Sequence, residues 1–327
     1  MSGKCCSVSR FPFLPEGELG LTSANRAFLR NRKSLEEAAE AGETLEALCT
    51  LCDCGSMQLT VELPDGMKGV IPKEEAGFQP GSPETKDIAV ITRVGKPVQF
   101  KILSIRENER GEATAVLSRR AAQRECCEQY LSRLRPGDIL PARVTHLEPF
   151  GAFCDIGCGV IALLTVDRVS VSRISHPADR FRTGDSLCAV VSRVEESGRI
   201  SLSHRELLGT WEENAALFSA GQTVTGIIRS VEDYGIFVEL TPNLAGLAEV
   251  CGHVTPGDAC AVYIKSMIPE RMKIKLVLID TCGPAEVAPC RYFIDPEVTT
   301  HLDRWRYSPA GCRKIVETEF AESFAVR

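Results

Sequence analysis

Two short aromatic strings are the part of this sequence best suited to chemistry. Phe150-Gly-Ala-Phe153 and Tyr234-Gly-Ile-Phe237 each place an aromatic residue on both sides of a glycine, and they lie 84 residues apart. Each string follows a glycine-led, alternating apolar run at the same interval, which marks an internal repeat. Exposed aromatic rings on a small sheet stack on the bases of single-stranded nucleic acid. The strings therefore indicate a base-stacking surface that occurs twice.

One ring of each pair has an alternative place in the hydrophobic core. Residues three apart in a strand face opposite sides, so both rings share a surface only where a kink or bulge intervenes. Tyr234 favours exposure because its hydroxyl is readily satisfied by water. Since the pattern recurs, we expect both pairs to lie at the surface.

The elements that must position these rings are short strands of a unit that occurs three times. Each copy contains two glycine-led alternating runs, which open at Gly42, Gly95, Gly137, Gly184, Gly221 and Gly257. In the second copy the alternation predicts strands over 139–147, 150–156, 160–164, 187–194 and 199–203. Five short strands with a long connection between the third and fourth are typical of a closed OB-type barrel, which has no unpaired edge. A small open β-sandwich has the same strand spacing.

The predicted fold class is mainly β with helical linkers, in the form of three tandem five-stranded OB-type β-barrels. Serine-led stretches rich in Ala, Glu and Leu predict the helices before and between the copies. The predicted units are a flexible N-terminus over 1–22, a helix over 23–41, a degenerate barrel one over 42–120, a helical linker over 121–134, barrel two over 135–204, a helical linker over 205–219, barrel three over 220–280 and a C-terminal capping segment over 283–327.

The C-terminal segment interleaves aromatic and basic side chains. Residues 296–307 predict a short amphipathic helix. The string Arg304-Trp-Arg-Tyr307 offers either a nucleic-acid contact or a cap in which Trp305 and Tyr307 pack on barrel three. We favour the cap because tryptophan is usually well buried.

Composition and charge narrow the range of partners. The chain of 327 residues is 44% hydrophobic and carries a net charge of −6. Duplex DNA is not expected as a partner, because proteins that bind it through phosphate neutralisation are usually basic. No run of 18 apolar residues exists, so no membrane span is expected, and the start of the chain lacks a secretory signal. The predicted location is the cytoplasm.

The residues with catalytic or metal-binding potential form no recognisable constellation. The 15 cysteines include one CxxC spacing, at Cys49 and Cys52, without a second half-site to complete four zinc ligands. The five histidines are scattered, and no phosphate-binding loop or paired-carboxylate signature occurs. We therefore predict reduced cysteines that act as small hydrophobes, no metal, no cofactor and no enzymatic activity.

The second copy resembles a known family. From Gly137-Asp, through Phe150-Gly-Ala-Phe153, to the closing string Gly198-Arg-Ile-Ser-Leu-Ser203, it is similar to the S-one RNA-binding domain, named for the largest protein of the bacterial small ribosomal subunit. The match is specific in copy two, good in copy three and degenerate in copy one, and together the copies cover about residues 42–280. The resemblance implies OB-type barrels that bind single-stranded RNA.

The resemblance also implies site residues in barrel two. Phe150 and Phe153 match the two aromatic residues of the family, and Arg199 matches an arginine near the last hairpin. Glu195 stands where the family has aspartate, and Thr165 where it has histidine.

The other two copies keep less of this implied site. In barrel three Tyr234 and Phe237 match the aromatic residues and Lys273 replaces the arginine. An acid, Glu249, falls at the histidine position of that barrel, where it should repel phosphate. In barrel one the aligned string runs from Cys54 to Met57, with the glycine kept and both aromatic residues absent.

By resemblance, the function is that of a non-enzymatic protein that binds single-stranded RNA, such as mRNA, in translation. Barrels two and three would hold the RNA, barrel one would dock a protein, and the small ribosomal subunit is an implied partner. Two alternatives remain. One is a protein–protein scaffold of degenerate barrels, favoured by the acidic charge, and the other is an accessory RNA-binding subunit of an RNA-degrading complex.

Overall fold

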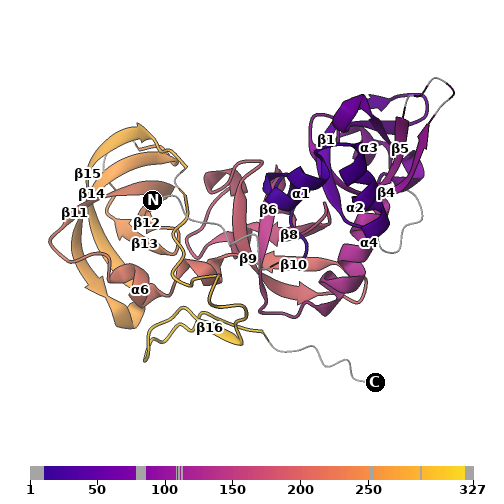
Figure 1. The fold of residues 1–327 in the computed structure, drawn as a ribbon. Helices are drawn as coiled ribbons and strands as arrows, with labels where there is room; N and C mark the ends of the chain where they lie inside the picture. The colour runs from indigo at the N-terminus through magenta and orange to yellow at the C-terminus, as the bar shows by residue number, and fades with distance from the viewer. Residues whose placement is uncertain are drawn as a thin grey trace.

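The computed structural model describes residues 11–78, 86–107, 109, 111, 113–250, 254–287 and 289–320. These residues form three five-stranded barrels that lie in a row, with barrel one at the right of Figure 1, barrel two in the centre and barrel three at the left. The predicted fold class is confirmed. The strands pair in a complete ring in each barrel, so the open β-sandwich is excluded.

The strands of barrel one are β1 (Leu45–Asp53), β2 (Gln58–Glu62), β3 (Lys68–Ile71), β4 (Pro97–Glu107) and β5 (Ala113–Ser118). Those of barrel two are β6 (Ile139–Glu148), β7 (Gly151–Asp155), β8 (Ile161–Thr165), β9 (Ser186–Val194) and β10 (Ile200–Ser203). Those of barrel three are β11 (Thr223–Glu232), β12 (Gly235–Thr241), β13 (Leu244–Ala248), β14 (Asp258–Ile268) and β15 (Lys273–Pro284). The helices are α1 (Ser23–Phe28), α2 (Arg32–Ala41), α3 (Asp87–Ile91), α4 (Arg119–Gln129), α5 (Val166–Val169) and α6 (Trp211–Ala215), and a C-terminal hairpin pairs β16 (Arg304–Arg306) with β17 (Glu317–Glu319).

The same ring topology holds in all three barrels. The third and fifth strands pair in parallel, as β8 and β10 do in barrel two. All the remaining neighbouring strands pair antiparallel, as β7 and β8 do. The inward residues of barrel two make a closed apolar core that includes Leu164 and Leu202, both fully buried. The ring therefore forms because alternate residues of each strand are apolar and face one another inside.

Two β-bulges recur at equivalent places in all three barrels. The first strand is bulged at Thr50, Thr145 and Arg229 in the three barrels, respectively. The fourth strand is bulged at Leu103, Ser192 and Lys265. A bulge inserts one residue and bends its strand, so the alternation of inward and outward side chains reverses beyond it.

The helical linkers are shorter than the sequence predicts. The single helix expected over 23–41 is two helices, because Asn31 interrupts the run and caps α2 through a hydrogen bond from the Ser34 N–H. The linker over 205–219 contains a 3-10 turn and the five-residue helix α6, which Thr210 caps.

The described part of the predicted flexible N-terminus is packed between barrels one and two. Glu16 is 7% exposed, and its carboxylate pairs with Arg119 at 2.6 Å. Its backbone N–H donates to the Asp155 carboxylate at 2.7 Å. Burial raises the pKa of Asp155 to about 7. The expected flexibility is therefore wrong for residues 11–22, because they supply the buried polar partners of this junction, whereas residues 1–10 lie outside the described ranges.

A second buried carboxylate joins barrels two and three. Glu239 of β12, 4% exposed, pairs with Arg229 of its own barrel at 2.8 Å and with Arg180 of barrel two. Glu239 and Asp155 occupy the same register position, opposite the first part of the following strand. Both junctions thus depend on an acid at one equivalent position.

The C-terminal segment runs along the junction of barrels two and three, where Figure 1 shows β16 below barrel two. The helix expected over 296–307 is wrong. Residues 295–299 turn and residues 304–306 form β16, because β16 pairs with β17 and the nearby Leu302 N–H donates to the Gly137 carbonyl of barrel two. Trp305 and Tyr307 are each 5% exposed and join the core cluster of barrel three.

His204 is buried at the end of barrel two. Its Nδ1 lies 3.1 Å from the carbonyl oxygen of Val169, so it donates there, and its Nε2 accepts from the Tyr292 hydroxyl at 3.3 Å. Burial lowers the pKa of His204 to about 4. The ring is therefore neutral in the folded protein and holds the C-terminal segment against barrel two.

Replacing Glu239 with alanine leaves two nearly buried guanidinium groups without their carboxylate. We expect Glu239→Ala to lower the free energy of unfolding by about 3–5 kcal/mol, the usual effect of breaking a buried pair. Urea unfolding followed by tryptophan fluorescence measures this, since both tryptophans, Trp211 and Trp305, are buried at this junction. Glu232→Ala, on the exposed end of β11, is the control, and equal losses in the two variants would contradict the assignment.

The neutral His204 predicts acid sensitivity. Because the pKa is about 4 in the folded protein against an ordinary 6.5, the unfolded chain takes up a proton first, and stability is lost as the pH falls below 6.5. The full contribution is about 3 kcal/mol. Relative to His204→Gln, the wild type should lose stability between about pH 7 and pH 4.5 in urea unfolding, while the exposed His146→Gln should follow the wild type. Parallel pH profiles of wild type and His204→Gln would contradict this.

Candidate nucleic-acid interface

The aromatic pair of barrel two forms a platform at the β6–β7 hairpin. Phe150 lies in the turn and is 55% exposed, and Phe153 lies in β7 and is half-buried. The two ring centroids are 5.9 Å apart and the rings meet edge to face at 89°. His146 of β6 stacks on Phe153 at 6.3 Å. Both predicted rings are thus at the surface, with a third ring beside them.

Gly151 allows the two strands under the platform to approach closely. It pairs with Thr165 of β8, and a Cβ atom on Gly151 would lie 2.5 Å from the carbonyl oxygen of Leu164. Gly235 in barrel three has the same role, because its Cβ would lie 2.8 Å from the carbonyl oxygen of Ala248. A side chain at either position would push the second strand away from the third.

A row of outward side chains runs around barrel two from the platform. Cross-strand pairing sets the row as His146, Phe153, Leu163, Ser201 and Arg193. Thr165 lies one outward position from Leu163, on the side of Phe150.

Arg199 and Glu195 lie on the β9–β10 hairpin. Arg199 is exposed. It precedes Ser201 by two residues, so its side chain lies on the same face of the barrel, about 7 Å further along the strand and away from Phe150. Glu195 is half-buried and donates its N–H to the carbonyl oxygen of Arg199 at 2.9 Å. The structure thus places Arg199 on the Phe153 side of the platform, with Glu195 supporting its hairpin.

Barrel three repeats the platform with different neighbours. Tyr234 is 69% exposed and meets Phe237 edge to face at 6.1 Å. Lys273 is exposed at the position of Arg199, and Lys275 lies in the place of Ser201. Glu249, at the position of Thr165, is also exposed. The platform is therefore present, but an acid lies at the position that is neutral in barrel two.

The alignment of barrel one needs a correction. Its β1–β2 hairpin has a four-residue turn where barrel two has two residues, so register places Thr60, not Met57, opposite the bulged strand in the position of Phe153. Met57 occupies the Phe150 position, and Gln58, not a glycine, occupies that of Gly151. The hairpin of barrel one therefore lacks aromatic residues, as predicted, but it also lacks a glycine at the position of Gly151.

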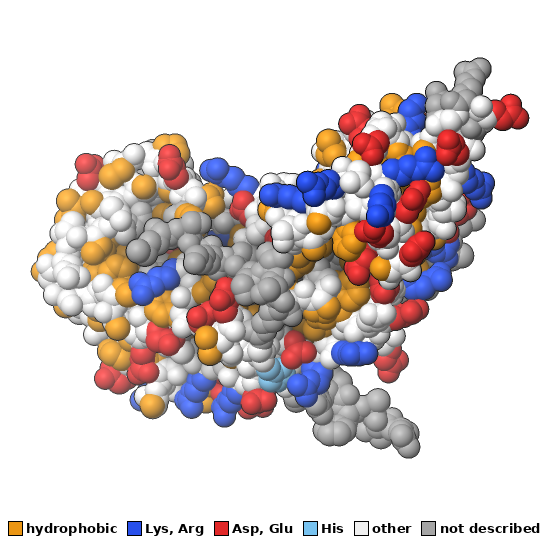
Figure 2. All heavy atoms as spheres, in the orientation of Figure 1, with side chains coloured by type: hydrophobic (Ala, Val, Ile, Leu, Met, Phe, Trp, Pro, Cys, Tyr) orange, Lys and Arg blue, Asp and Glu red, His pale blue; other side chains and the backbone are white. Residues whose placement is uncertain are grey.

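Figure 2 shows acidic and basic side chains intermixed over barrel one.

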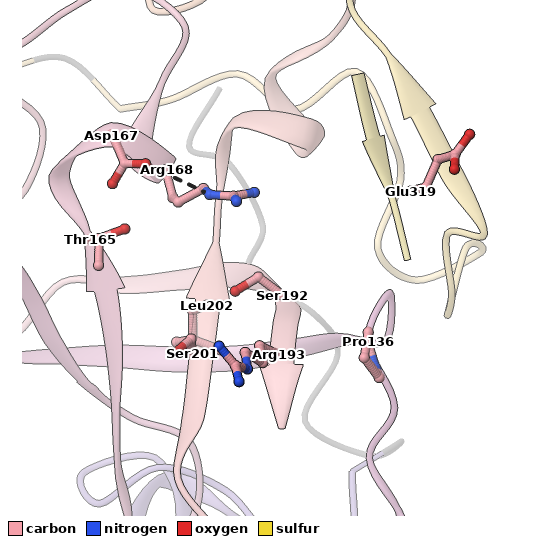
Figure 3. Close-up of a pocket in the computed structure, with 9 residues that line it drawn as sticks. All are labelled: Pro136, Thr165, Asp167, Arg168, Ser192, Arg193, Ser201, Leu202 and Glu319. Atoms are coloured by element: carbon pink, nitrogen blue, oxygen red, sulfur yellow. Dashed lines mark ion pairs between the residues drawn. The ribbon is translucent and has the colours of Figure 1, made fainter. Parts of the chain in front are cut away.

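A groove of about 670 Å³ adjoins the platform of barrel two. It lies between β8, β9 and β10 and the C-terminal hairpin, and Figure 3 shows Arg168 extending toward the space in front of β17. Its lining residues are Pro136, Thr165, Asp167, Arg168, Ser192, Arg193, Ser201, Leu202 and Glu319. Thr165 is therefore shared by the platform hairpin and the groove.

Sequence reasoning missed His146, Arg168 and Arg193. Strict alternation from the buried Val144 and Val191 turns His146 and Arg193 inward, but the bulges at Thr145 and Ser192 turn both outward. Arg168 follows β8 in a segment without strand periodicity. These bulges lie in β6 and β9, outside the aromatic strings, and no sequence pattern marked them.

Cysteines and metal ligands add no further site to the described ranges. The 12 described cysteines are free thiols. Burial raises the pKa of Cys154 to about 12 and of Cys127 to about 11, so these thiols stay protonated. Within the same ranges, no group of three or more metal-binding side chains occurs, and no helix has the length and apolar character needed to cross a membrane.

Comparison with known proteins assigns the class. Residues 133–205, which make up barrel two, match the family described as the S1 RNA binding domain. This is the S-one family that the second copy resembles in sequence. The chain therefore contains an S1 RNA-binding domain that carries the Phe150–Phe153 platform.

Particular relatives extend this similarity beyond barrel two. Small ribosomal subunit protein bS1 of Leuconostoc lactis is 36% identical over 162 residues, which are 46% of this chain and 38% of that protein. The bS1 protein of Rhizobium meliloti is 29% identical over 287 residues, 81% of this chain and 48% of that protein. The chain is thus a distant homologue of bS1 over most of its length, and it spans half or less of these two relatives.

One similar solved structure is a multidomain protein with nucleic acid binding domains from Streptococcus pneumoniae. It covers 73% of this chain, and this chain covers 73% of it, at 15% identity and a TM-score of 0.24.

The close approach at Gly151 predicts a specific sensitivity. Gly151→Ala should lower the free energy of unfolding by roughly 1–3 kcal/mol, because the new Cβ overlaps the Leu164 carbonyl and no flexible side chain can yield there. Gly55→Ala is the matched control, since Gly55 lies in the exposed turn of barrel one and its Cβ would meet only the Asp53 side chain. Urea unfolding of both variants measures the difference, and a larger loss for Gly55→Ala would contradict the register.

Proposed function

We propose that this chain is a non-enzymatic, cytoplasmic protein that binds single-stranded RNA by stacking bases on barrels two and three. By homology with bS1, its RNA is mRNA and its role lies in translation. The observation that carries the proposal is the edge-to-face pair of rings at the surface of an S1-domain barrel, the exposed Phe150 with the half-buried Phe153. Stacking suits every base, because each base has a π-face.

Barrel two is the stronger RNA site in this proposal. Its platform has three rings, with His146 extending the aromatic surface, and Arg199 lies on the same face. Cationic side chains beside a stacked base contact its phosphate. Barrel three has two rings and Lys273, but Glu249 opposes phosphate there.

Barrel one has a different role in the proposal. Leu51, 57% exposed, takes the place of His146 in the outward row, and Leu48 is 51% exposed. An apolar side chain in place of stacking rings suits a protein contact better than RNA. We assign barrel one to docking a protein, with the small ribosomal subunit as the candidate.

The stacking model predicts that removing two aromatic rings greatly lowers the affinity for RNA. Phe150→Ala combined with Phe153→Ala should weaken binding of a labelled polypyrimidine RNA of about 12 nucleotides by roughly 10- to 100-fold, since each stacked base contributes about 1–3 kcal/mol. Fluorescence polarisation measures the dissociation constant. Tyr234→Ala with Phe237→Ala should cause a smaller loss.

Tyr263→Ala is the control for this experiment. Tyr263 is an aromatic residue, 38% exposed on β14, that pairs with Thr223 away from the platform. Tyr263→Ala should leave the dissociation constant for the RNA unchanged. If the double variant of barrel two binds RNA as the wild type does, base stacking at this platform is wrong, and the protein–protein scaffold becomes the better account.

A further inference from the structure

We propose that the groove between barrel two and the C-terminal hairpin binds the ribose-phosphate backbone of the RNA nucleotides next to those stacked on Phe150 and Phe153. Arg168 and Arg193 are the phosphate contacts, and Glu319 on the opposite wall limits the affinity. This inference rests on the proposed function, because it extends the same RNA strand beyond the platform.

The groove is continuous with the platform. Thr165 pairs with Gly151 under the aromatic hairpin and also lines the groove. The outward row passes from Phe153 through Ser201 to Arg193, and the last two residues line the groove. A strand whose bases stack on the rings therefore reaches the groove without crossing another element.

The groove carries cations suited to phosphate. Arg193 is exposed, and among the described residues it has no ion pair. Within the described ranges, the ion pair of Arg168 is with its neighbour Asp167, at 3.7 Å, and Asp167 is 72% exposed. An exposed pair of this kind contributes little, so its arginine remains available to an anion.

The opposite wall of the groove is preformed. The C-terminal segment is held to barrel two by the Leu302 N–H on the Gly137 carbonyl and by the Ile139 N–H on the Thr300 carbonyl, both at 2.9 Å. His301 Nδ1 also lies 2.7 Å from the Asp138 carboxylate. A wall fixed before binding reduces the ordering that binding requires.

Glu319 gives this wall an opposing charge. It lies on β17, 63% exposed, with its carboxylate 3.6 Å from Arg304. Figure 3 shows this carboxylate turned away from Arg168 and Arg193, so it weakens phosphate binding through its field and does not block the groove.

Barrel three differs from barrel two at three described positions of the groove, of which one, Lys275 in place of Ser201, adds a cation. Ser266 takes the position of Arg193, and Glu249 takes that of Thr165. At the positions of Arg193 and Thr165 the two barrels therefore differ, whereas both have an aromatic pair.

The test compares a short and a long RNA on the full chain. Polypyrimidine RNAs of about 4 and about 12 nucleotides are titrated at several salt concentrations, so that the short one occupies the platform alone. The combined variant Arg168→Ala and Arg193→Ala should bind the short RNA like the wild type and the long RNA roughly 5- to 50-fold more weakly at low salt. For this variant, the slope of log affinity against log salt concentration should be shallower by about 1.4, because two phosphate contacts on a single strand are lost.

Glu319→Gln should bind the long RNA roughly 2- to 5-fold more tightly than the wild type.

The matched control removes the same charge elsewhere. Arg26→Ala with Arg30→Ala takes two exposed arginines from the α1 region of barrel one, outside the groove. If the groove variant behaves like this control on the long RNA, or weakens both RNAs equally, the groove inference is overturned while stacking on Phe150 and Phe153 stands. If the wild type binds neither RNA, the proposed function fails and the groove inference fails with it.

Discussion

The need to close five short strands into a barrel is the constraint on which the rest of the structure depends. Closure bends the first and fourth strands, and each barrel meets this need with bulges at the same two places. In barrel two these bulges reverse the alternation, so His146 joins Phe153 at the surface and Arg193 faces outward. The surface that we assign to RNA is therefore a consequence of barrel closure as much as of residue choice.

A second constraint fixes how the barrels meet. Asp155 and Glu239 occupy one register position in successive barrels; Asp155 accepts from the Glu16 N–H beside barrel one, and Glu239 pairs with Arg180 of barrel two. In barrel one the equivalent Glu62 is exposed, since no barrel packs there among the described residues. Breaking such a buried pair is far more costly than removing a surface pair, so these positions favour one fixed arrangement of the row. The groove depends on this order, because the C-terminal segment reaches barrel two along the junction with barrel three.

Local patterns predicted much of the fold and the aromatic part of the site. The strands expected over 139–147, 150–156 and 187–194 match β6, β7 and β9 closely, because apolar alternation and glycine turns are local signals. The alignment of Cys54 to Met57 in barrel one with the aromatic strings was wrong, because a longer hairpin turn shifts the register without changing the composition. The expected C-terminal helix over 296–307 failed because pairing with distant backbone outweighed local amphipathicity.

The sequence by itself determined the threefold repeat, the barrel class and the identity of the surface aromatic pairs, because each of these is recorded in residue types at fixed short spacings. Only the tertiary structure decided which polar residues join those rings. His146 and Arg193 depend on bulges that local alternation does not reveal, and the Arg168 groove needs a wall from residues near 319. Glu16 shows the same dependence, since its burial follows from Arg119, more than 100 residues away. Contacts between distant segments carry no local pattern, so packing alone sets them.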